Sequence, residues 1–203
     1  MPIVFTRNDS NATETFSSGI TMAQIDAPLL VETTETFQTQ DHALSFRNWC
    51  FEGYRLANSA LTHSSPITFD VHNDVDLVRF YFNRRGALKL DCKQLKREFN
   101  IENGHYNVLY SAELDTKMIH LDKYSEIFSL QLTRDTFFQL LSESGGSLET
   151  FANGVNKGGR SILSPQWQQI SYHVDKCIRE ILTCEYIKDL KKLYLQSKAN
   201  ELF

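Results

Sequence analysis

The chain has 203 residues, 41% of them hydrophobic and 23% charged, and this composition excludes a disordered or fibrous protein. Its 21 basic and 25 acidic side chains give a formal net charge of −4, which argues against a free-standing nucleic-acid-binding domain. No apolar run approaches the roughly 20 residues that span a bilayer, and the first residues lack the pattern of a signal peptide. We therefore expect a cytoplasmic globular protein with no membrane contact.

Residues 1–132 have the pattern of an antiparallel β domain. Their apolar segments are short, often alternating and rich in β-branched and aromatic residues, as in 44–51, 75–82 and 127–132. Roughly eight or nine closely spaced strands, separated by turn signals, predict a sandwich or small barrel. A parallel sheet would need helices between its strands, and this part of the sequence offers none of adequate length.

Residues 133–203 switch to a helical period. A short helix from Thr133 is predicted to end at residues 144–146, and Ser164-Pro165 predicts the start of a long one, with a capping serine and a proline in the first turn. A second long helix after residues 183–185 completes a helical hairpin. The chain stops at Phe203 within a helical pattern, so we expect that a further segment followed it.

The two long helices carry an apolar stripe that we interpret as a homodimer interface. The stripe is wider than packing on one sheet requires, so one part can bury against the β domain and the rest against a second copy. The alternative is that the whole stripe is core within one chain. The candidate interface residues are Ile170, Val174, Cys177, Ile178, Ile181, Leu190 and Tyr194.

Aromatic and polar side chains in the β domain suggest a ligand pocket at the mouth of a barrel. Arg79 and Tyr81 share one face of a predicted strand, opposite the face that carries Phe80. Arginine with tyrosines suits an anionic or phenolic small molecule. The candidate pocket residues are Trp49, Arg79, Tyr81, Tyr106 and Tyr110.

The sequence offers no catalytic or cofactor motif. Residues 154–161 approximate a phosphate-binding loop, but arginine replaces the lysine and no strand precedes it, which favours a surface loop. The six histidines and four cysteines form no local pair with metal-ligand spacing. We therefore predict no catalytic residues, no metal ligands and no cofactor.

The most specific stretch is Cys184 to Leu202. It reads C-x-Y followed by L-x-x-L-Y-L-x-x-K-A-x-E-L, and it resembles the linker helix of AraC-type transcriptional regulators, in particular the branch that includes the pyochelin-responsive regulators. The β domain resembles the family's sensor domain only in layout.

The resemblance implies a cupin-like effector-binding β domain in residues 1–132 and a helical dimerisation and linker subdomain in residues 133–203. It further implies that DNA is bound only through a helix-turn-helix domain that this chain lacks, so we expect no sequence-specific DNA binding and no enzymatic activity. The alternatives are a metal-dependent cupin enzyme, such as a dioxygenase or isomerase, and a ligand-free interaction scaffold. A scaffold would have a filled interior, without a cavity of roughly 300 Å³ or more.

Overall fold

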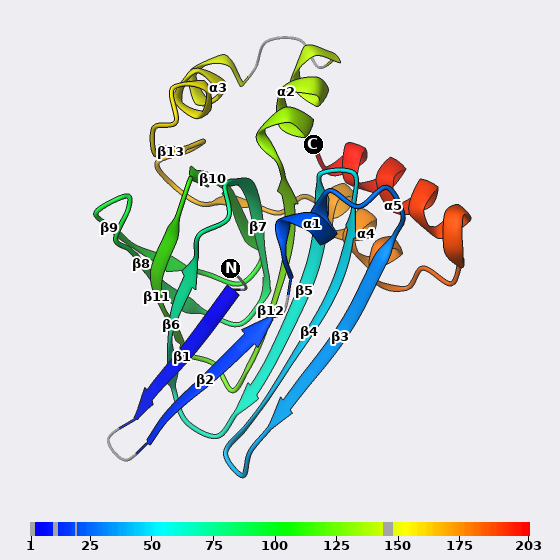
Figure 1. The fold of residues 1–203 in the computed structure, drawn as a ribbon. Coiled ribbons are helices and arrows are strands. Elements are labelled where there is room, and N and C mark those ends of the chain that lie inside the picture. Colours follow the sequence, from blue (N-terminus) through cyan, green and yellow to red (C-terminus); the bar gives the residue numbers. More distant parts are fainter. Residues whose placement is uncertain (1–2, 10–11, 19, 144–147) are drawn as a thin grey trace.

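The computed structural model describes residues 3–9, 12–18, 20–143 and 148–203, which form two antiparallel sheets and a set of helices (Figure 1). The smaller sheet has the strand order β2-β1-β6-β11-β8-β9. Its strands are β1 (Ile3–Asp9), β2 (Ala12–Ser18), β6 (Ile67–Asn73), β8 (Leu88–Cys92), β9 (Arg97–Ile101) and β11 (Leu114–His120).

The larger sheet has the order β13-β10-β7-β12-β5-β4-β3, and β14 also pairs with β10. Its strands are β3 (Val31–Gln38), β4 (His42–Phe51), β5 (Tyr54–His63), β7 (Leu77–Arg85), β10 (His105–Ser111), β12 (Tyr124–Leu132), β13 (Ser161–Ile162) and β14 (Gln168–Gln169). The helices are α1 (Met22–Ile25), α2 (Arg134–Glu143), α3 (Glu149–Asn156), α4 (Tyr172–Leu182) and α5 (Lys188–Leu202).

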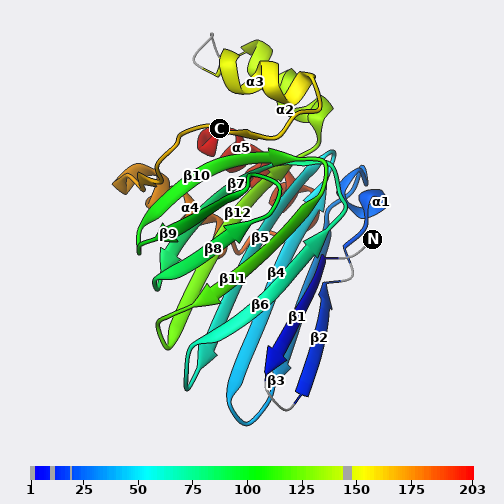
Figure 2. The ribbon, with the colours of Figure 1, turned by 90° about the vertical axis from the view of Figure 1, so that its left-hand side faces the viewer.

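The two sheets pack face to face as a sandwich (Figure 2). Alternate residues of the larger sheet, such as Leu44, Phe46 and Leu61, meet Phe69 and Leu90 of the smaller sheet in one apolar cluster. This mainly antiparallel fold with a C-terminal helix pair confirms the predicted fold class.

The outer face of the larger sheet forms a second core with the helices. Leu56, Phe80 and Leu130 point outward from three neighbouring strands and pack in the same cluster as Ile178 of α4 and Leu195 of α5. Figure 1 shows α4 and α5 beside this sheet and α2 and α3 at its end. The larger sheet is therefore buried on both faces.

The first long helix begins later than the sequence signals predict. Ser164-Pro165 indicates a helix start, but α4 begins at Tyr172, after an N-cap at Ser171. The residues between run beside β10 instead: Asn107 Nδ2 donates to the Ser164 carbonyl at 2.9 Å, and the Ile170 amide donates to the Gly104 carbonyl at 2.7 Å. These bonds satisfy backbone groups that a helix would otherwise satisfy. The predicted helix end at 144–146 lies outside the described residues.

The apolar stripe of α4 packs within the chain. Cys177, Ile178 and Ile181 are each at most 1% exposed and belong to the core shared with the larger sheet, while Ile170 and Val174 pack against it partly buried. Side chains this deeply buried cannot touch a second copy in this conformation. In this conformation Cys177, Ile178 and Ile181 belong to the core within one chain, which is the alternative to a dimer interface.

The buried face of α5 differs from the expected one. Lys191, Leu195 and Leu202 are buried, whereas Leu190 is 57% and Leu193 61% exposed. Tyr194 is partly buried against the core. Lys191 lies on the side of α5 that faces the sheet, with its stem buried and its Nζ 2.7 Å from Glu32 Oε2 on β3. None of the described helices is long and apolar enough to cross a membrane.

Candidate functional site

A cavity of about 100 Å³ lies between the two sheets. Its wall is mainly apolar, and apolar cavities of about 150 Å³ accept a molecule the size of benzene. The cavity is smaller than the roughly 300 Å³ typical of pockets for drug-sized ligands, so in this conformation it suits a small molecule. The polar residues of its wall are Arg55, Ser59, Tyr81, Asn83, Thr116, His120, Ser125, Ser129 and Gln131.

Part of this polar wall is built by β5, β12 and β7. In the ladder, Gln131 lies opposite Arg55 on one side and Arg79 on the other, and Ser129 is paired with Tyr81 in the next inward-facing row. Side chains alternate between the faces of a strand, so all five point away from the helices. Two arginines therefore share one row on the inner face of the sheet.

Arg55 is a buried cation, 3% exposed, on the cavity wall. Its Nε and Nη2 donate to Asn48 Oδ1 at 3.2 and 2.7 Å, and its Nη1 donates to Gln131 Oε1 at 3.1 Å. The amides are held in turn, because Asn48 Nδ2 donates to Thr33 Oγ1 and Gln131 Nε2 donates to Ser129 Oγ. The guanidinium is thus fixed by neutral oxygens, and burial lowers its pKa.

Arg79 has a different role from the one predicted. Its guanidinium donates to the backbone carbonyls of Leu77 and Ser111, each at 2.9 Å, and to that of Val75. It is 1% exposed and is not among the residues of the cavity wall. Arg79 therefore ties together the ends of β7 and β10.

Of the five predicted pocket residues, Tyr81 lines the cavity. Burial raises the pKa of its phenol, and its hydroxyl makes no hydrogen bond to any residue that the structure describes. Trp49 and Tyr110 are buried in the core beneath the helices, and Tyr106 stacks on Phe82 there with the ring centroids 5.6 Å apart. The structure does not bring these three to the cavity.

Sequence reasoning missed Arg55, Asn48 and Gln131. A signal for Arg55 was present, because it interrupts an otherwise apolar start of a strand between Tyr54 and Leu56. The two amides lie 7 and 76 residues from Arg55 in sequence, so their grouping depends on the sheet topology.

His120 is a buried histidine on the cavity wall. Its Nδ1 lies 2.7 Å from Ser125 Oγ, and its ring is 6.4 Å from that of His63 and 5.9 Å from that of Phe69. Burial, together with the nearby His63, lowers its pKa to about 3. His120 is therefore neutral near neutral pH. Within the described ranges, no group of three or more His, Cys, Asp or Glu side chains could hold a metal ion.

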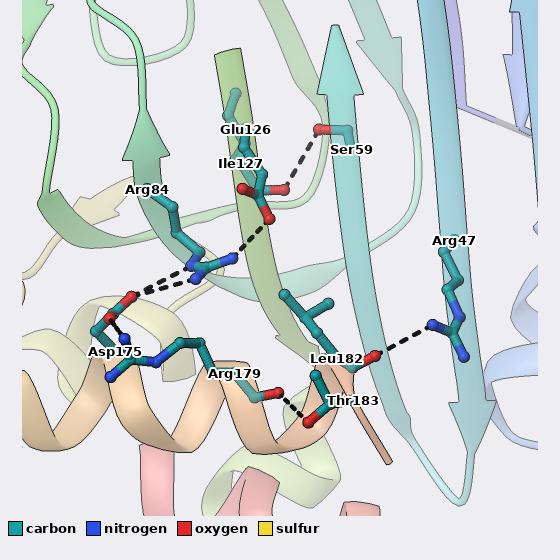
Figure 3. A network of polar contacts seen from close by, with 9 residues as sticks. All are labelled: Arg47, Ser59, Arg84, Glu126, Ile127, Asp175, Arg179, Leu182 and Thr183. Carbon is teal, nitrogen blue, oxygen red and sulfur yellow. Dashed lines mark hydrogen bonds and ion pairs between the residues drawn. The ribbon is translucent and has the colours of Figure 1, made fainter. Parts of the chain in front are cut away.

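Polar contacts fasten α4 to the outer face of the same sheet (Figure 3). Arg84 of β7 lies 2.6 Å from Glu126 Oε1 on β12 and 3.3 Å from Asp175 Oδ1 in the first turn of α4. At the other end of α4, Arg47 of β4 donates to the Leu182 carbonyl at 3.2 Å. The helix is thus held at both ends by strands whose inner faces line the cavity.

The fold is similar to that of several solved structures. The AraC-like transcriptional activator CuxR is 9% identical, with a TM-score of 0.47, covering 83% of this chain and 60% of CuxR. The ToxT K231A structure from Vibrio cholerae is 12% identical, with a TM-score of 0.50, covering 74% of this chain and 54% of ToxT. Salicylate 1,2-dioxygenase from Pseudoaminobacter salicylatoxidans is 13% identical, with a TM-score of 0.37, covering 53% of this chain and 30% of the enzyme.

The class is that of an N-terminal domain of an AraC-type transcriptional regulator, as the linker-helix resemblance predicts. The protein-family model for the N-terminal domain of the regulatory protein PchR matches residues 91–203, which is more than half of the chain. The chain belongs to this family. No curated protein matches it, and it spans about 60% of the length of CuxR.

The depressed pKa of His120 predicts acid sensitivity. Between pH 6.5 and about 3 the unfolded chain binds a proton at this residue that the folded chain does not, so stability falls as the pH falls. In the variant His120→Gln, we expect the free energy of unfolding to fall less steeply as the pH is lowered, by up to about 1.4 kcal/mol per pH unit. Urea unfolding at stepped pH measures it. His72→Gln, on an exposed position of β6, should retain the acid loss that depends on His120. Equal slopes for H120Q and the wild type would contradict the assignment.

Proposed function

We propose that this chain is the effector-binding and dimerisation portion of an AraC-type transcription regulator, and not an enzyme. A small molecule binds in the cavity between the sheets, and DNA is contacted by a helix-turn-helix domain of the regulator. The observation that carries this proposal is the mainly apolar cavity with a fixed, buried Arg55 on its wall. Membership of the PchR N-terminal domain family supports the regulatory role.

The route from effector to output runs through the larger sheet. Strands β5, β12 and β7 line the cavity with one face and contact the helices with the other. On β5, for example, Arg55 faces the cavity, whereas the adjacent Tyr54 faces the helices and its Oη donates to Asn200 Oδ1 of α5 at 2.9 Å. A ligand can shift an equilibrium only if it binds one arrangement better than another. We infer that occupancy of the cavity changes the relative stability of two arrangements of the α4–α5 pair.

A ligand-free interaction scaffold is the second candidate, and the small volume of the cavity favours it. The two candidates differ in one measurable respect. A sensor binds a small molecule inside the sandwich, whereas a scaffold binds nothing there.

A thermal-shift screen of a metabolite library, with neutral and anionic members, tests the proposal. We expect at least one compound to raise the Tm of the wild type, because a ligand that binds the folded state stabilises it. The hit should lose its effect in Ala57→Phe, whose ring fills the cavity. Ala60→Phe, on the opposite face of the same strand, should keep it. A screen without hits, or hits that persist in A57F, would favour the scaffold.

Dimerisation is proposed through the exposed side of α5. Ile187, Leu190 and Leu193 are 73%, 57% and 61% exposed and follow one another at three-residue steps. An exposed apolar strip of this kind suits a second copy related by a two-fold axis, in which the same residues serve both partners. Two subunits would present two DNA-binding domains to two half-sites.

We expect the double variant L190E/L193E to be a folded monomer, because these side chains lie outside the core of the chain. Size-exclusion chromatography with light scattering measures the mass, and circular dichroism checks the fold. Leu29→Glu, at another exposed leucine, should leave the dimer intact. A wild-type chain that is monomeric at micromolar concentration, or a double variant that is still dimeric, would refute this interface.

A further inference from the structure

Arg55 is a buried cation with unused hydrogen-bonding capacity. A guanidinium has five N–H donors, and three hydrogen bonds account for Arg55 among the described residues, all of them to the amide oxygens of Asn48 and Gln131. Two N–H groups therefore have no acceptor in the part of the chain that the structure describes. Leaving such donors buried is unfavourable unless another group receives them.

No carboxylate neutralises Arg55 at close range. Among the described residues, no acidic side chain lies within ion-pairing distance of it, and Glu35 attracts it only from farther away. Arg79, in the same row, adds a second positive charge, which Asp76 attracts from a distance. Arg55 therefore brings a positive charge without a close carboxylate partner to the cavity wall. A buried charge of this kind is normally paired.

Tyr81 adds a further donor beside this charge. Its hydroxyl has no partner among the described residues, and the electrostatic influence of both Arg55 and Arg79 reaches it. The rest of the wall is mainly aliphatic and aromatic, as at Leu61 and Phe69.

We propose that the effector is a small, mainly apolar molecule with a single carboxylate. Its oxygens accept hydrogen bonds from the two free N–H groups of Arg55 and from the hydroxyl of Tyr81. This inference rests on the proposed function, since it names the ligand class of the same cavity. A carboxylate matches a guanidinium with two parallel hydrogen bonds, and the apolar body fills the space between the sheets. The volume of about 100 Å³ lies below the roughly 150 Å³ of a cavity that binds benzene, so a six-carbon chain or one ring is the upper limit for this body.

The test compares acids with their neutral amides on the whole chain. Hexanoate and benzoate are titrated by calorimetry against hexanamide and benzamide, at constant ionic strength. We expect each acid to bind at least tenfold more tightly than its amide, because the amide lacks the charge that pairs with Arg55. Arg55→Met should abolish this preference. Arg47→Met, on the outer face of β4, should retain it.

Arg55→Lys covers the case in which R55M does not fold. It keeps the positive charge but loses the planar fork, so we expect weaker acid binding with some preference over the amide. Equal affinity of acid and amide for the wild type would overturn the inference while leaving an effector-binding cavity intact. Absence of binding by all four compounds would overturn it too. The library screen with A57F decides independently whether the proposed function stands.

Discussion

Three adjacent strands, β5, β12 and β7, serve two cores at once, and the rest of the molecule depends on their register. Each places alternate residues between the sheets and the others under the helices, as with Arg55 inside and Leu56 outside. A slip of one residue would exchange the two faces and would bury Arg55 against α4 and α5. In this register Gln131 of β12 lies opposite Arg55 of β5 and Arg79 of β7.

Ion pairs add to the apolar packing of the helices on the outer face of this wall. Arg84 lies at a register irregularity between β7 and β12, and it contacts both Glu126 of the neighbouring strand and Asp175 of α4. Its side chain is 10% exposed, so water screens these contacts less than those of a surface pair. On the inside, Arg55 has only neutral partners among the described residues. The wall thus has satisfied charges toward the helices and an unsatisfied one toward the cavity.

Alternation in the sequence predicted the antiparallel β domain and placed Arg79 and Tyr81 on one face, although it indicated eight or nine strands where the structure describes twelve in residues 1–132. It could not tell which face the helices cover, so Trp49, which lies beneath them, entered the predicted pocket. The prediction of a helix start at Ser164 was wrong, because the backbone after Ser164 is hydrogen-bonded beside β10 instead of within a helix. The side of α5 that faces the sheet includes Lys191, whose partner Glu32 lies 159 residues away in the sequence. Local signals carry none of these long-range contacts.

The proposed function requires that a ligand in the cavity affects the helix pair through the shared wall. Hydrogen–deuterium exchange of the whole chain, with and without saturating hexanoate, tests it most directly. We expect slower exchange in β5, β12 and β7, and with it a change in the exchange of the amides of α4 and α5, although the ligand touches neither helix. Slower exchange confined to the strands, with α4 and α5 unchanged, would contradict it.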